Sequence, residues 1–355
     1  MGSTQFGNFG NFCRDSTLPV CNLLSDSHDQ TGGWGGCELT GIPLSGGRRL
    51  GNLGSILLCG IAIATAIYLI LRSERKKAAV GRRYVDCPGR ISENGRNEGR
   101  RRQDRTERSS NSDSVSALLP NYCQTPLALS PPSLQARVTD IDAREMQLFL
   151  VGYVVISICE IFTVGEFPLS STVRIAFTGI HIGFIIASTW MLMLNAVVGY
   201  QFIDDGTPLS LGLILASAAV LLIGTGYIAL DTGFKWTGTF ESSYEGPNYR
   251  NIAIYVLYQL APLIFLVAFY VLETVLVLRV LGETRPMVYL TLAAVLFALG
   301  QIFNYAISPH ICNGTDGKID GALFQTLFTL LSVVMVWVFW SSITEDDWPM
   351  PASYP

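Results

Sequence analysis

The chain has 355 residues, of which 49% are hydrophobic and only 15% are charged, and its mean hydropathy is +0.37. This composition is typical of a protein with several membrane spans and argues against a soluble two-domain enzyme. The formal net charge of -4 provides no basic surface, so nucleic acid is not an expected partner.

Residues 1–52 precede the first long apolar stretch and include three cysteines, Cys13, Cys21 and Cys37. This segment lacks the basic start, apolar core and small-residue cleavage site of a signal peptide, so we expect the first span itself to target the chain to the membrane.

Seven apolar stretches are long enough to cross a membrane, because a helix needs roughly 20 residues to cross about 30 Å of hydrocarbon. The sequence therefore predicts an all-α polytopic membrane protein with its first transmembrane helix at 53–71 and a six-helix transmembrane region at 146–341. The predicted spans are Leu53 to Leu71, Met146 to Val164, Val173 to Val198, Leu209 to Leu230, Ile252 to Val280, Met287 to Ile307 and Ala322 to Ser341.

The placement of basic residues predicts the orientation of the spans. Six of them follow the first span closely (Arg72, Arg75, Lys76, Lys77, Arg82 and Arg83), whereas only Arg48 and Arg49 precede it. Because cytosolic loops are enriched in Lys and Arg, this predicts a lumenal N-terminus, and seven crossings then place the acidic tail, residues 342–355, in the cytosol.

Two further features agree with this orientation. Asn313-Gly314-Thr315 is a sequon for N-glycosylation, and it falls in a predicted lumenal loop. Cys13, Cys21, Cys37 and Cys312 all fall on the lumenal side, where disulfides persist, and four cysteines allow three pairings. Cys59 and Cys159 lie within spans and are interpreted as packing residues.

The basic loop of residues 72–145 contains a polar, arginine-rich segment, residues 84–143, that admits two interpretations. Its composition cannot bury enough apolar surface to fold, so it is either a disordered cytosolic insert or not protein sequence at all. Codons for Arg83-Tyr84-Val85 can contain a splice donor, and codons for Ala143-Arg144 can contain an acceptor. We therefore hypothesise a retained intron in the gene sequence, whose removal keeps the reading frame.

Three ionisable residues lie inside predicted spans: Glu160, His181 and Glu273. Such residues are costly in hydrocarbon and are candidates for function, here for contact with a membrane partner. The alternative for each is a structural role, in which the side chain pairs within the bundle or reaches the headgroups. In the fourth predicted span, small residues predict close helix packing.

The loop around Asp204 and Asp205 lies at a predicted cytosolic span boundary beside a Gly-Thr-Pro turn. Turn formation accounts for one acid but not for both. A contact with a partner is the alternative interpretation of the pair.

No catalytic, cofactor-binding or metal-binding motif is recognisable in the sequence. The three histidines are widely separated, which argues against a zinc site. A GxSxG motif, a HExxH motif and a nucleotide-sugar transferase domain with a QxxRW-like motif are all absent. We therefore expect a protein that is not an enzyme and has no cofactor.

Several stretches resemble the fungal chitin synthase export chaperones. They are FGNFCRDSTLPVCNLL near the start, EMQLFLVGYVVISICEIFTVGEFPL, WMLMLNAVVGYQFIDDGTPLSL, and ISPHICNGTDGKIDGALFQTLF followed by EDDWP. The resemblance covers essentially everything except residues 84–143, and that family's short first loop favours the retained-intron hypothesis.

The resemblance implies a multi-pass protein of the endoplasmic reticulum membrane that escorts a chitin synthase toward the cell surface. Its implied partner is the chitin synthase client. The apolar spans make the lipid bilayer a second partner, and a vesicle-coat adaptor that binds the cytosolic acids is a further hypothesis. Two alternatives from other classes are a seven-helix sensor and a small transporter. The transporter would require internal repeats or paired broken helices, and only Pro262 is placed to kink a span.

Overall fold

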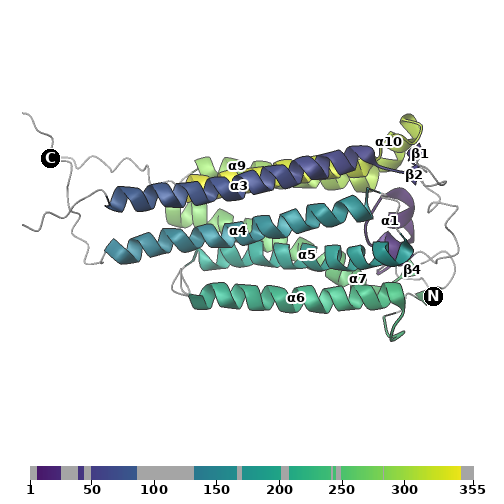
Figure 1. The fold of residues 1–355 in the computed structure, drawn as a ribbon, viewed down its shortest axis with the longest axis horizontal. Coiled ribbons are helices and arrows are strands. Elements are labelled where there is room, and N and C mark those ends of the chain that lie inside the picture. The colour runs from purple at the N-terminus through teal and green to yellow at the C-terminus, as the bar shows by residue number, and fades with distance from the viewer. Residues whose placement is uncertain are drawn as a thin grey trace, which may run out of the picture.

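The computed structural model describes residues 6–24, 39–43, 49–85, 132–165, 170–200, 208–240, 243–244, 249–282 and 284–344. Over these residues the protein is a bundle of long helices with two very small two-stranded sheets (Figure 1). The long helices are α3 (Leu53–Val85), α4 (Pro132–Thr163), α5 (Ser171–Val198), α6 (Pro208–Phe234), α8 (Ala261–Val275), α9 (Arg285–Ile302) and α11 (Gly321–Thr344).

Short elements complete the chain. The short helices are α1 (Gly10–Asp15), α2 (Cys21–Leu24), α7 (Ile252–Ile254) and α10 (Ser308–Gly314). Strand β1 (Ile42–Pro43) pairs antiparallel with β2 (Arg49–Leu50), and β3 (Ser243–Tyr244) pairs antiparallel with β4 (Tyr249–Arg250).

The described residues contain seven helical segments that are long and apolar enough to cross a membrane, which confirms the predicted number. They are Leu53–Glu74, Arg144–Thr163, Ser171–Val198, Ser210–Phe234, Ile252–Arg279, Arg285–Gly314 and Gly321–Ile343. Helices α3 and α4 continue past their spans, so that part of the segment expected to be disordered or excised, residues 132–143, is helical.

Two spans combine α-helical turns with π-helical ones, in which hydrogen bonds link residues five apart. These π-helical segments are η1 (Tyr255–Leu260) and η2 (Leu276–Leu281), on either side of α8, and η3 (Phe303–Ile307), between α9 and α10. Pro262 lies just after η1, in the first turn of α8. Since π-helical turns are rare and often occur at functional sites, η1 and η3 mark a candidate functional region of the bundle.

The spans pack mainly as neighbouring pairs, α3 with α4, α5 with α6, and α9 with α11, while α5 also contacts α4 and α8. Glycines bring α5 and α6 close together. A Cβ on Gly179 would lie 2.6 Å from Leu230 of α6, and one on Gly183 would lie 3.0 Å from Leu222. The fourth span therefore packs closely against α5, but through glycines of α5. A Cβ on Gly212 or Gly224 of the fourth span itself would meet nothing within 4 Å.

The two ends of the bundle differ. At one end, called here the capped end, lie α1, α7, α10 and the two small sheets (Figure 1). At the opposite end, the far end, Ser73 of α3 accepts a 2.9 Å hydrogen bond from Gln147 of α4, and the Arg72 guanidinium lies 5.2 Å from the ring centroid of Trp337.

The apolar core is divided accordingly. The larger cluster fills the far half and is contributed by the spans alone, with Leu69, Leu150, Ala196 and Trp337 among its buried residues. The cluster at the capped end is completed by residues of the N-terminal segment. The N-terminal segment is therefore part of the bundle's core.

Candidate functional site

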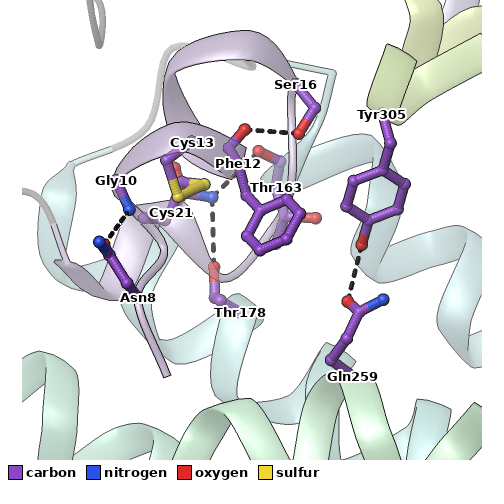
Figure 2. The surroundings of a disulfide bond; sticks show 11 residues. Asn8, Gly10, Phe12, Cys13, Ser16, Cys21, Thr163, Thr178, Gln259 and Tyr305 are labelled. Carbon is purple, nitrogen blue, oxygen red and sulfur yellow. Dashed lines mark hydrogen bonds between the residues drawn. A yellow bond between two sulfur atoms is a disulfide. The ribbon is translucent and has the colours of Figure 1, made fainter. Parts of the chain in front are cut away.

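The N-terminal cap, defined here as residues 6–24, is the most distinctive structure at the capped end. Its helices α1 and α2 are joined by a disulfide between Cys13 and Cys21 (Figure 2). The cap buries five apolar side chains besides the cystine (Phe9, Leu18, Val20, Leu23 and Leu24) in a cluster with Ile182 of α5, Ala229 of α6 and Ile254 of α7.

Aromatic contacts seat the cap on the two spans that contain η1 and η3. The ring of Phe9 lies 5.7 Å from that of Tyr255, and the ring of Phe12 lies 5.6 Å from that of Tyr305. Tyr305 in turn donates a 2.8 Å hydrogen bond to Gln259, which joins η3 to η1 beneath the cap (Figure 2). The π-helical segments thus supply the aromatic floor on which the cap sits.

Polar contacts connect the cap to His181, one of the three ionisable residues predicted to lie inside spans. Asn22 donates a 3.1 Å hydrogen bond to the carbonyl oxygen of Thr163 at the end of α4, and a longer one of 3.4 Å to Thr178 of α5. The Oγ1 atom of Thr163 lies 3.0 Å from Nδ1 of the buried His181. His181 is therefore a hydrogen-bonded residue of the α4–α5 interface, next to the cap.

Asp320, at the start of α11, joins three segments at the capped end. Its carboxylate accepts a 2.8 Å hydrogen bond from Thr17 of the cap and a 2.7 Å hydrogen bond from Asn52, which precedes α3. Asn52 also accepts a hydrogen bond from the Ser55 amide and so caps α3. Burial raises the pKa of Asp320, although these hydrogen bonds oppose the shift.

Glu160 is held among three spans within the bundle. Its carboxyl oxygen accepts a 2.6 Å hydrogen bond from Thr326 of α11. The Cys59 thiol of α3 also forms a hydrogen bond with the Glu160 carboxyl group. Both partners belong to this chain, so the arrangement agrees with the structural alternative for Glu160.

Glu273 differs from the other two ionisable residues. It is 8% exposed and lies on α8, one turn from Phe269 and one turn from Val277, both of which are in the larger apolar cluster. Tyr200, whose hydroxyl donates to the Leu272 carbonyl oxygen at 2.6 Å, is the ionisable group placed near it. The structure therefore separates Glu160, His181 and Glu273 into three environments and does not assemble them into one site.

The remaining predicted site residues lie either at the capped end or outside the described part of the chain. Asn313 is exposed on α10 at the capped end, and Cys312 beside it is buried and disulfide-bonded. Asp204, Asp205, Cys37 and residues 345–355 of the acidic tail lie outside the described residues, whereas residues 342–344 end α11. Within the described part of the chain, no three His, Cys, Asp or Glu side chains are grouped so that they could hold a metal ion.

Sequence reasoning missed Thr17, Asn22, Asn52 and Asp320, which carry the polar contacts of the capped end. Asn52 had a detectable signal, because an Asn directly before an apolar run is a typical helix N-cap. Thr17 and Asn22 had none, since their partners lie more than a hundred positions away.

A family model described as chitin synthase export chaperone matches residues 5–87 and 132–354. The chain belongs to the chitin synthase export chaperone family. The match includes the cap and all seven spans and omits residues 88–131.

Individual relatives carry the same family name. A chitin synthase export chaperone of Chaetomium globosum is 30% identical over 215 residues, and one of Coccidioides immitis is 29% identical over 215 residues. In both cases the match covers 60% of this chain and 63% of the relative's own length. The chaperone of Emericella nidulans is 23% identical over 346 residues, which are 96% of this chain and 84% of that relative. No solved structure matches the chain.

Proposed function

We propose that this protein is a chaperone of the endoplasmic reticulum membrane that a chitin synthase requires for folding or assembly and for export to the cell surface. The observation that carries the proposal is the family match, which extends over the cap and every span. In this proposal the protein is not an enzyme and acts by binding another membrane protein.

The orientation that fits this role has the capped end in the lumen. The cystine of the cap supports it, because disulfides persist in that compartment. The basic residues that follow the first span support it independently, because loops rich in Lys and Arg favour the cytosolic side and these residues follow the far end of that span. The sequon at Asn313 is then lumenal, as N-glycosylation requires.

Glu273 is the intramembrane residue that we assign to client contact. Glu160 and His181 have hydrogen-bond partners within the chain, whereas Glu273 has an apolar environment on α8, and an acid there is costly to maintain. A basic or polar side chain on a client span would offset this cost by pairing with it. Loss of Glu273 is therefore expected to weaken client binding, and loss of Glu160 or His181 to act through the stability of the chaperone.

Asp204, Asp205 and the acidic tail provide the proposed cytosolic contacts. In this orientation the two aspartates and the tail face the cytosol, where basic juxtamembrane segments of a client or a vesicle-coat adaptor would bind them through charge. Reversal of charge at Asp204 and Asp205 together is expected to reduce client export. Unchanged export would remove this loop from the mechanism.

The test of the function is the location of a fluorescently tagged chitin synthase in fungal cells with and without this gene. The expected result is retention of the synthase in the endoplasmic reticulum when the gene is absent, with the chaperone itself resident there. Normal delivery of every synthase would overturn the proposal and favour the sensor interpretation, which predicts residence at the cell surface and a ligand-dependent signal.

A second experiment tests the role of Glu273 in cells that retain the chaperone. Glu273→Gln is expected to lower co-purification of the synthase from detergent extracts several-fold without lowering the amount of chaperone. Thr274→Val is the matched control, because Thr274 is the next residue and its hydroxyl bonds to Tyr270 of the same helix. Equal co-purification with both variants would exclude Glu273 from client binding.

A further inference from the structure

Cys312 is disulfide-bonded, and the described residues do not include its partner. Four of the seven other cysteines are excluded as partners: Cys13 and Cys21 bond to each other, and Cys59 and Cys159 are free. The partner of Cys312 is therefore one of three residues outside the described ranges, which are Cys37, Cys87 and Cys123.

Chain length excludes two of these three. Consecutive Cα atoms are about 3.8 Å apart, so Cys87 lies within about 8 Å of Val85, and Cys123 within about 34 Å of Pro132. Val85 and Pro132 are at the far ends of α3 and α4, and these helices of 33 and 32 residues are each about 50 Å long. Helix α10, which contains Cys312, lies at the capped end (Figure 1), beyond the reach of both cysteines.

Cys37, in contrast, is tied to the neighbourhood of Cys312 by the residues that follow it. The Thr40 amide donates a 2.9 Å hydrogen bond to the Gly317 carbonyl oxygen, and the Gly317 amide donates one of 2.9 Å to the Cys312 carbonyl oxygen. The Thr40 hydroxyl also donates to Gly317 at 3.2 Å. Since Cys37 is three residues from Thr40, its Cα lies within about 11 Å of the Thr40 Cα.

We propose that Cys37 and Cys312 form a second disulfide, which joins the N-terminal segment to the loop between α10 and α11. Formation of the bond removes two protons and two electrons from the two thiols. The electrons pass to the disulfide of a dithiol–disulfide oxidoreductase, which is reduced to two thiols.

The two disulfides differ in when they can form. Cys13 and Cys21 are 8 positions apart and can pair as soon as the N-terminal segment has crossed the membrane. Cys312 lies in the last turns of the sixth span, so its bond must wait until six spans have been made. Closure of the second disulfide therefore marks a chain whose lumenal end has been assembled, and this conclusion does not depend on which client the protein escorts.

Peptide mapping of the intact protein tests the pairing directly. The protein is denatured with N-ethylmaleimide and no reductant, then cut after acidic residues, which separates Cys13 from Cys21 at Asp15 and Cys21 from Cys37 at Asp26 and Asp29. The expected linked peptides join Cys37 to Cys312 and Cys13 to Cys21. A linkage of Cys312 to any other cysteine, or an alkylated Cys312, would overturn the proposal.

Single substitutions give a second measurement. Cys37→Ser should raise maleimide labelling of Cys312 in the denatured protein from near zero to near one label per chain. Cys159→Ser is the control, because Cys159 is a free cysteine, and it should leave Cys312 unlabelled. If Cys37→Ser also leaves Cys312 unlabelled, the pairing is wrong. Should Cys37→Ser fail to accumulate, the peptide map of the unsubstituted protein decides the question alone.

Discussion

Thr17 donates its hydroxyl hydrogen to the Asp320 carboxylate at 2.8 Å, although the two residues are 303 positions apart. Asn52 donates to the other carboxylate oxygen at 2.7 Å. One acid at the start of α11 thus holds the N-terminal cap and the start of the first span in a fixed relation. The stability of the capped end should depend on this acid and its donors.

Replacing Asn52 by alanine should destabilise the protein more than replacing Thr17 by valine. Asn52→Ala removes the donor to a buried carboxylate and the cap of α3, and we expect a loss of about 2 to 3 kcal/mol in the free energy of unfolding. Thr17→Val removes one hydrogen bond and should lose about 1 kcal/mol. Denaturant unfolding in detergent micelles measures both. Equal losses of unfolding free energy for the two variants would contradict the double role of Asn52 as donor to Asp320 and as cap of α3.

Asp320 should make stability depend on pH. Because burial raises its pKa, the native state holds the Asp320 proton more tightly than the unfolded chain does. The stabilising effect of protonation is present below the ordinary aspartate pKa of 3.8 and is lost as the pH rises through the raised native value. The melting temperature of the unsubstituted protein should therefore fall relative to that of Asp320→Asn over this interval. If the melting temperatures of the two proteins change in parallel with pH, Asp320 does not contribute to the pH dependence of stability.

Thr326 should stabilise the bundle through Glu160. Thr326→Val removes the 2.6 Å hydrogen bond to the carboxyl group, and hydrogen bonds between spans are worth about 1 kcal/mol. Thr274→Val is the control, because that hydroxyl bonds to the Tyr270 carbonyl of its own helix. We expect a lower thermal transition for Thr326→Val alone. Equal melting temperatures for Thr326→Val and Thr274→Val would indicate that the hydrogen bond to Glu160 contributes no stability.

Asn313 should carry a glycan that is added before its loop folds. The Thr315 hydroxyl of the sequon donates to the Ile311 carbonyl oxygen at 2.9 Å and accepts from the Ile319 amide at 3.3 Å, so it is engaged once the turn after α10 has formed. Endoglycosidase H should shift the unsubstituted protein on a gel, and Asn313→Gln should run at the shifted position without treatment. Absence of any shift would argue against modification at this site.

Mature message should lack the codons of the proposed intron. The family model omits residues 88–131, which lie wholly within residues 84–143. After excision, residues 74–83 and 145–146 would connect Ser73 to Gln147, which are in contact at 2.9 Å, and about a dozen residues suffice for a connection between antiparallel helices. Reverse-transcription PCR across the junction should give a short product. A single long product would show that the segment is translated.

The spans could be predicted from sequence because the signal is local. An apolar stretch such as Val173 to Val198 is readable from length and hydropathy alone, and the structure places a span at Ser171–Val198. The cap could not be predicted, because Phe9, Leu18 and Val20 form no periodic pattern and their partners in α5, α6 and α7 are far away in the sequence. The same holds for Glu160, whose place inside a span was evident but whose partner Thr326 was not.

Span lengths have a consequence for how the protein sits in a bilayer. The shortest span, Arg144–Thr163, has 20 residues and is about 30 Å long, which matches an average hydrocarbon core, whereas Arg285–Gly314 has 30 residues and is about 45 Å long. Tilt alone absorbs only part of such a mismatch. Since Arg285–Gly314 ends in α10, we expect the surplus to carry α10 out of the hydrocarbon core at the capped end. The unequal lengths would then act as a spacer that separates the loop after α10 from the hydrocarbon.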